Sequence, residues 1–254
     1  LSIERSEEAV QAARKAVELD PQNFTAWQNL GFGLRDLGDH SGAAKAFETA
    51  SGLGEIPPDG LATWAECLDR LGRFGEAERI VRRALEVAPD DPAVLTLLGW
   101  LQMEQSEDDA ARETFKRSLS LKPEQFIAAY NYGILCLRAD MVDTGLRWLR
   151  RATSIEPKSI PAWHTLAMEL VRHGLREEAL PVAERSLRLA PDDTAIKALV
   201  RNLKGAETEA ETPMISIDFE DPAPIGPAPE PKPTSDEDGA AVLGLSILRI
   251  GGES

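Results

Sequence analysis

The residues that could carry acid–base, nucleophilic or metal chemistry are few and widely spaced. The histidines are His40, His164 and His173, and the cysteines are Cys67 and Cys136. Neither set has the spacing of a metal site or a redox CxxC pair, and the sequence has no Gly-rich phosphate loop and no nucleophile elbow. The many carboxylates fall at helical surface spacing, which is typical of solvated faces with i,i+4 partners. The sequence therefore predicts a protein that is not an enzyme and has no metal site and no cofactor.

The charge of the chain argues against two classes of partner. The net charge is −15 and the sequence pI is about 4.7. Residues 206–254 alone hold eleven acidic and two basic side chains. A phosphate backbone or an anionic membrane surface needs a basic face, so we expect no nucleic acid partner. No apolar run reaches the roughly 20 residues of a membrane span, so we expect no direct membrane insertion.

The elements that position these side chains follow one repeating pattern. Small residues recur every 34 residues at two places in the pattern, and a proline recurs with the same period. The first small position is held by Gly31, Ala65, Gly99, Gly133 and Ala167, the second by Ala43, Ala77, Ala111, Gly145 and Ala179, and the proline by Pro89, Pro123, Pro157 and Pro191. A fixed period of this length predicts an array of stacked helix pairs, in which the small residues allow close approach.

Five full repeats are predicted, at 24–57, 58–91, 92–125, 126–159 and 160–193. A turn residue separates the two helices of each repeat, and it is glycine at Gly38, Gly72 and Gly174. Ser106 and Asp140 stand at this place in the other two repeats. The first repeat ends with Glu55 where the later ones have proline, which predicts an irregular and longer loop before Pro58.

The ends of the array are predicted to differ from its middle. Residues 1–23 match only the second half of a repeat, with a helix over 6–18 capped by Ser6. Residues 194–204 form one amphipathic helix that caps the other end, so the array covers 1–204. Residues 205–254 form an acidic, Pro-rich tail that cannot bury a core and is expected to be disordered.

The pattern of Trp or Leu, Leu, Gly or Ala, Leu, then Gly, Ala, Phe, Ala and Pro resembles the tetratricopeptide repeat (TPR). The resemblance covers roughly residues 6–204. It implies an all-α solenoid, a right-handed superhelix of antiparallel helix pairs whose first helices line a concave groove. Arrays of this family usually bind peptides or partner proteins and do not catalyse reactions.

The family register also implies which side chains line the groove. Apolar side chains gather there in the third to fifth repeats, flanked by two arginines, which suits a hydrophobic and mildly acidic peptide. The alternative is that some of them pack between neighbouring first helices. Asn29 and Asn131 share the sixth position, where an amide can pair with a peptide backbone. The predicted peptide-binding residues are Asn29, Phe32, Trp100, Met103, Tyr130, Asn131, Ile134, Leu137, Arg138, His164, Met168 and Arg172.

The tail ends in an apolar segment, 240–250, that looks like a docking element. Left uncovered, such a run favours aggregation, so we expect it to dock in the groove of its own chain or of a neighbour, which allows self-association. Plain disorder without a partner is the alternative. The docking residues would be Val242, Leu243, Leu245, Ile247, Leu248 and Ile250.

The favoured function is a cytoplasmic, non-catalytic scaffold or adaptor that binds a protein or peptide partner. One alternative is a repeat module or accessory subunit of an enzyme complex whose catalytic part lies in another chain or in missing sequence. Another is an envelope protein that has lost its signal segment, since the sequence begins at Leu1 and not at a methionine.

Overall fold

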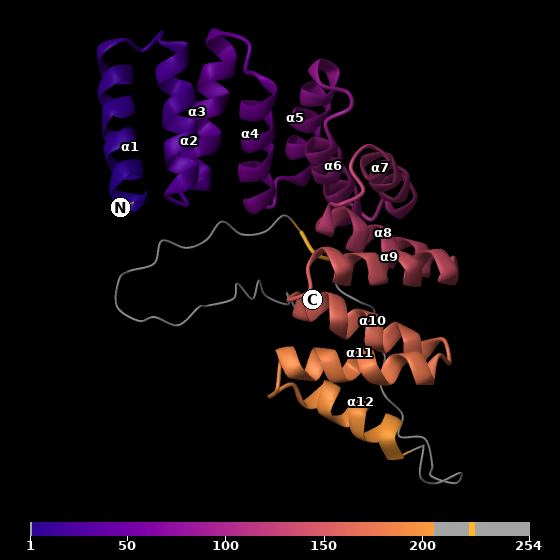
Figure 1. The fold of residues 1–254 in the computed structure, drawn as a ribbon. Helices are drawn as coiled ribbons and strands as arrows, with labels where there is room; N and C mark the ends of the chain where they lie inside the picture. Colours follow the sequence, from indigo (N-terminus) through magenta and orange to yellow (C-terminus); the bar gives the residue numbers. More distant parts are fainter. Residues whose placement is uncertain (1, 206–223, 227–254) are drawn as a thin grey trace, which may run out of the picture. The chain divides into compact units, whose positions relative to one another are not determined.

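The computed structural model describes residues 2–205 and 224–226, which contain twelve α-helices (Figure 1). The helices are α1 (Ser2–Leu19), α2 (Phe24–Asp36), α3 (His40–Leu53), α4 (Pro58–Arg70), α5 (Phe74–Val87), α6 (Pro92–Glu104), α7 (Asp108–Leu121), α8 (Phe126–Arg138), α9 (Val142–Ile155), α10 (Ile160–Arg172), α11 (Arg176–Leu189) and α12 (Thr194–Gly205). They fall into two compact units. Unit 1 holds the described residues up to Thr114, and unit 2 holds the described residues from Phe115 to Gly226.

Within each unit, consecutive helices pair through the small residues of the repeat. In unit 1, α2 packs on α3, and a Cβ atom at Gly31 would lie 2.8 Å from the ring of Phe47. In unit 2, α8 packs on α9, and a Cβ atom at Gly145 would lie 2.9 Å from the carbonyl oxygen of Gly133. Real Cβ atoms do not come this close to a backbone oxygen, so glycine sets the spacing of this pair.

The turn between the two helices of a repeat is left-handed, whichever residue occupies it. Gly38, Gly72 and Gly174 have φ angles of 76°, 72° and 78°. Ser106 and Asp140 adopt the same conformation, with φ of 62° and 58°. The turn is thus imposed by the helix pair, and the two side-chain-bearing residues carry its conformational cost.

The junction after the first repeat is irregular but not longer, so that part of the expectation is wrong. Residues 54–57 connect α3 to α4, and residues 88–91 connect α5 to α6, in four residues each. At the later junction, the N–H of Asp91 donates to the carbonyl of Ala88. Pro57 stands at the place of Asp91 and has no N–H, and Gly54 is fully extended, with φ of −177°. Conformation and not length distinguishes this loop.

The two terminal helices begin or end close to their predicted bounds. The first helix begins at Ser2 and not at residue 6. Ser6 therefore lies inside α1, and the prediction that it caps this helix is wrong. In unit 2, α12 packs on α11 and buries Ile196, Leu199 and Leu203. The predicted docking segment 240–250, from Val242 to Ile250, lies outside the described residues.

Candidate peptide-binding site

A short piece of the C-terminal region, residues 224–226, lies against α8 in unit 2 (Figure 1). The contact is made by the side chain of Asn131, which is completely buried. Its Nδ2 donates to the carbonyl oxygen of Ile225 at 2.5 Å, and its Oδ1 accepts from the backbone N–H of Ile225 at 2.8 Å. One side-chain amide therefore satisfies both backbone groups of one residue.

This pairing repeats the geometry of a β-ladder. In an antiparallel sheet, two opposed residues form two N–H···O bonds with each other. Here the side-chain amide of Asn131 takes the place of the backbone of one of these residues. Both bonds require the oxygen to face the N–H of Ile225 and the NH₂ to face its carbonyl, which fixes the amide orientation. Asn131 can thus hold an extended peptide by its backbone.

Beside Asn131, the wall of the site is stiffened by Tyr130. Its hydroxyl lies 2.9 Å from the hydroxyl of Thr165 on α10, and its ring stacks on Phe126 with centroids 6.0 Å apart. Burial raises the pKa of Tyr130 to about 12, while the hydrogen bond with Thr165 acts in the opposite direction and the charge of Glu169 adds to the rise. The phenol is therefore neutral at any physiological pH and ties α8 to α10.

A buried acid on α10 was not anticipated from the sequence. Glu169 is 2% exposed, and its Oε1 lies 3.2 Å from Nη1 of Arg172. Its Oε2 lies 3.7 Å from Nε2 of His173. Glutamate followed by arginine three positions later on the same helix was the available signal. His164, predicted to line the groove, places its Nδ1 3.4 Å from Oδ2 of Asp193.

The predicted site residues of unit 2 divide by exposure. Tyr130, Asn131 and Ile134 are buried, Leu137, His164 and Met168 are half-buried, and Arg138 and Arg172 are exposed. Leu137 contacts α9, since a Cβ atom at Gly145 would lie 2.5 Å from its Cγ. Leu137 thus packs within its own repeat, whereas the contact of Tyr130 with Thr165 on α10 joins neighbouring first helices, as in the alternative. The role of the apolar set in binding a peptide stays a prediction.

The remaining predicted residues belong to unit 1. Asn29 is exposed, Phe32 and Trp100 are half-buried, and Met103 is 8% exposed. The Nε1 of Trp100 donates to Oδ1 of Asp69 at 2.9 Å, so this indole links α6 to α4. Burial raises the pKa of the Asp69 carboxyl, whereas the Trp100 bond and the charge of Arg70 oppose the rise.

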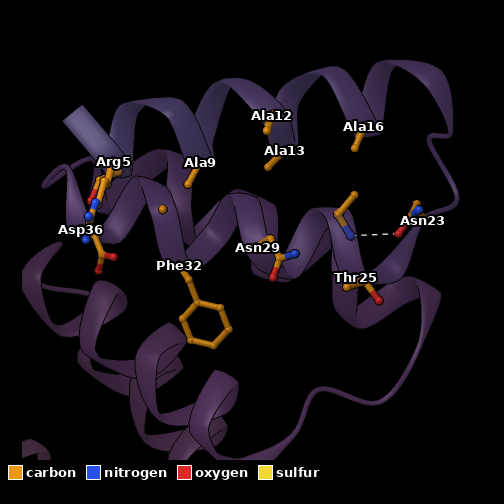
Figure 2. A pocket seen from close by; sticks show the side chains of 13 residues that line it. Arg5, Ala9, Ala12, Ala13, Ala16, Asn23, Thr25, Asn29, Phe32 and Asp36 are labelled. Carbon is orange, nitrogen blue, oxygen red and sulfur yellow. Dashed lines mark hydrogen bonds between the residues drawn. The ribbon is translucent and has the colours of Figure 1, made fainter. Parts of the chain in front are cut away.

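Asn29 and Phe32 line an open hollow in unit 1 with a volume of about 850 Å³ (Figure 2). Its other wall is the alanine face of α1, formed by Ala9, Ala12, Ala13 and Ala16. Figure 2 shows Asn29 and Phe32 on α2, across the hollow from these small side chains. Gly33 also lines the hollow, and a Cβ atom there would lie 2.7 Å from Val10, so α1 and α2 are in close contact at this residue.

The described residues offer little else for chemistry. Among them, no three His, Cys, Asp or Glu side chains gather as a metal site would require. Cys67 and Cys136 are buried, and neither forms a disulfide bond. Within the same residues, every helix is too short or too polar to cross a membrane.

The paired helices, repeated in register in both units, define an α-solenoid built from two-helix repeats. Family profiles described as tetratricopeptide repeat match residues 1–60, 34–101 and 92–125. The chain belongs to the tetratricopeptide repeat family.

The matches include longer proteins and a solved structure of the same fold at low sequence identity. The chain is 25% identical over 151 residues to the tetratricopeptide repeat-containing protein trd-1 of Caenorhabditis elegans, covering 48% of this chain and 20% of trd-1. It is 29% identical over 171 residues to the protein CTR9 homolog of Arabidopsis thaliana, covering 65% of this chain and 16% of that protein. It thus spans a fifth or less of these curated relatives. The structure of YrrB, described as a TPR protein with an unusual peptide-binding site, superposes with a TM-score of 0.62 at 18% identity, over 78% of this chain and 100% of YrrB.

Proposed function

We propose that the chain is a non-catalytic interaction module that binds an extended, apolar peptide segment of a partner protein at Asn131 of unit 2. The observation that carries the proposal is the double hydrogen bond between the Asn131 amide and the backbone of Ile225. A side chain that pairs with the backbone N–H and C=O of a bound peptide contributes affinity whatever the side chain of the bound residue, as in β-strand addition.

The surroundings of Asn131 support the same conclusion. The half-buried Met168 offers apolar surface on α10, and the exposed Arg138 and Arg172 stand at the ends of α8 and α10. These cations suit a segment with acidic flanks. The fold of YrrB, a peptide-binding protein by its description, is compatible with this use.

The test uses the full chain carrying Ile225→Pro, which removes the N–H that Asn131 receives from the tail. Binding of this variant is measured on an array of ten-residue peptides. Each peptide contains Pro-X-Gly, and only the residue X differs between peptides. We expect binding when X is apolar and not proline. Adding Asn131→Ala should weaken binding at least about tenfold, since two hydrogen bonds are lost.

The matched control is Asn29→Ala in the same background, because Asn29 holds the same register position in unit 1. It should leave binding unchanged. Asn131→Asp keeps the acceptor but loses the donor, so it should also weaken binding while preserving the shape of the site. Circular dichroism confirms the helix content of each variant. The proposal fails if no peptide binds, or if binding ignores both Asn131 substitutions.

A further inference from the structure

The residues at 224–226 have the properties of a ligand and not of a structural element. They are not helical, they are each half-buried, and their described hydrogen bonds go to a single side chain of the repeat array. The caps described for α8, α9, α10 and α11 in unit 2 are made by residues of the array itself. Their position on Asn131 therefore calls for an explanation in terms of binding.

The sequence around Ile225 explains why this residue is the one held. It reads Asp-Pro-Ala-Pro-Ile-Gly-Pro-Ala-Pro-Glu over 221–230. Proline has no N–H, so every proline in the stretch is excluded from the double bond with Asn131. Ile225 provides the N–H and a large apolar side chain together, whereas the neighbouring alanines and glycine offer little surface to bury.

The same prolines lower the cost of binding. Residues that precede proline are biased toward extended conformations, which applies here to Gly226. A Pro-rich segment is already close to an extended helix in the free state, so it loses less conformational freedom when it docks. An extended backbone is what the Asn131 amide requires.

The connection between the array and the segment allows it to dock on its own chain. The last helix of unit 2 ends at Gly205, and the docked residues begin at Pro224. Residues 206–223, eighteen in number, join the two, and a flexible chain of this length has a root-mean-square span of about 25 Å, on the scale of one domain. Tethered at this length, a segment has an effective concentration on the order of millimolar.

We propose that the Asn131 site recognises an extended segment of the Pro-apolar-Gly type, and that Pro224–Gly226 is a built-in ligand of this class that a partner must displace. This inference rests on the proposed function of the site and adds its ligand class and its control. The partner then presents a proline-flanked apolar residue whose own N–H and C=O replace those of Ile225. When Pro224–Gly226 occupies the Asn131 site of its own chain, a higher concentration of partner is needed for binding.

The test is a titration of a fluorescein-labelled peptide with the sequence of residues 221–230 into the full chain, followed by anisotropy. In the wild type, the tethered segment competes with the tracer. With Ile225→Pro, the tethered competitor is removed, and the tracer should bind about tenfold more tightly, as expected for a competitor at ~1 mM with a Kd of ~0.1 mM. Ile217→Pro is the matched control, since it makes the same change elsewhere in the tail. It should bind like the wild type.

The outcomes separate the two proposals. Equal tracer affinity in the wild type and Ile225→Pro overturns the built-in ligand while leaving the site itself intact. If the opened chain binds other peptides of the array but not the tracer, the ligand class is wrong. If it binds no peptide at all, the proposed function falls and this inference with it. A wild-type dimer by light scattering that becomes monomeric with Ile225→Pro would show exchange between copies, which overturns docking in cis.

Discussion

Asn29 in unit 1 and Asn131 in unit 2 are the same residue at the same register position, three repeats apart, in opposite situations. Asn29 is exposed on the wall of a hollow of about 850 Å³. Asn131 is completely buried and bonded to the backbone of Ile225. The same amide is thus covered by a segment in unit 2 and exposed in unit 1.

The neighbouring residues differ in the same direction. In unit 2, the hydroxyls of Tyr130 and Thr165 form a hydrogen bond of 2.9 Å. The residues at the same repeat positions in unit 1 are Gln28 and Thr63. Gln28 is 8% exposed, and its Nε2 lacks a hydrogen-bond partner among the described residues. Thr63 instead bonds the carbonyl of Asp59 within its own helix. The first helices of unit 2 are thus tied together beside the asparagine, whereas the equivalent position of unit 1 holds an unsatisfied amide.

The largest effect should come from removing the two asparagines one at a time. Asn131→Ala abolishes both bonds to Ile225, so the Ile225 amide should exchange with solvent deuterium at least about tenfold faster. Asn29→Ala removes an exposed amide and should leave that exchange unchanged. Hydrogen–deuterium exchange with mass spectrometry measures the deuterium uptake of the proteolytic peptide that contains Ile225. Faster exchange in both variants would mean that the contact depends on the array as a whole.

The next pair concerns Tyr130 and Gln28. Tyr130→Phe removes the bond to Thr165 and should destabilise unit 2 by about 1–2 kcal/mol, because the Thr165 hydroxyl is left buried. Gln28→Leu removes an unsatisfied buried amide and should be neutral or stabilise unit 1 by about 1 kcal/mol. Urea unfolding, with exchange to assign the change to a unit, measures both. A loss in Gln28→Leu as large as that in Tyr130→Phe would contradict the comparison.

The sequence predicts the framework of this comparison because the framework is periodic. The 34-residue repeat alone places Asn29 and Asn131 on equivalent first helices and puts a turn at Ser106 and Asp140. Periodicity does not say how far neighbouring helices lean over a side chain. The sequence therefore predicts Tyr130 and Ile134 on the groove face, whereas their burial becomes evident only in the structure.

The docked residue could not be found by the same reasoning. Hydropathy selects runs of apolar residues, such as 240–250, whereas Ile225 stands alone among prolines. The Asn131 contact uses the N–H and C=O of a single residue, which every residue except proline possesses. Only the combination of one apolar residue with flanking prolines was available as a signal. Glu169 was missed because acids on helices are usually solvated.

A smaller effect is expected at the two left-handed turns that lack glycine, one in each unit. Ser106→Gly in unit 1 and Asp140→Gly in unit 2 relieve φ angles of 62° and 58°, and each should raise stability by about 0.5–1 kcal/mol. The gain should be smaller for Asp140, since aspartate tolerates this conformation better than serine. The urea midpoint measures each change. A destabilised Ser106→Gly would mean that the serine side chain supports the turn.

The smallest effect concerns pH and is confined to unit 1. Burial raises the pKa of Asp69 above its ordinary value of 3.8, so the folded chain holds this proton more tightly than the unfolded chain does. The resulting stabilisation is complete below pH 3.8 and is lost as the pH rises through the raised value. In Asp69→Asn this titration is absent, and the amide still accepts from Trp100. The wild type should therefore lose stability relative to Asp69→Asn as the pH increases from 3.8, as measured by exchange in α4 and α6. The reverse slope would mean that the Trp100 bond and the charge of Arg70 outweigh burial at this carboxyl.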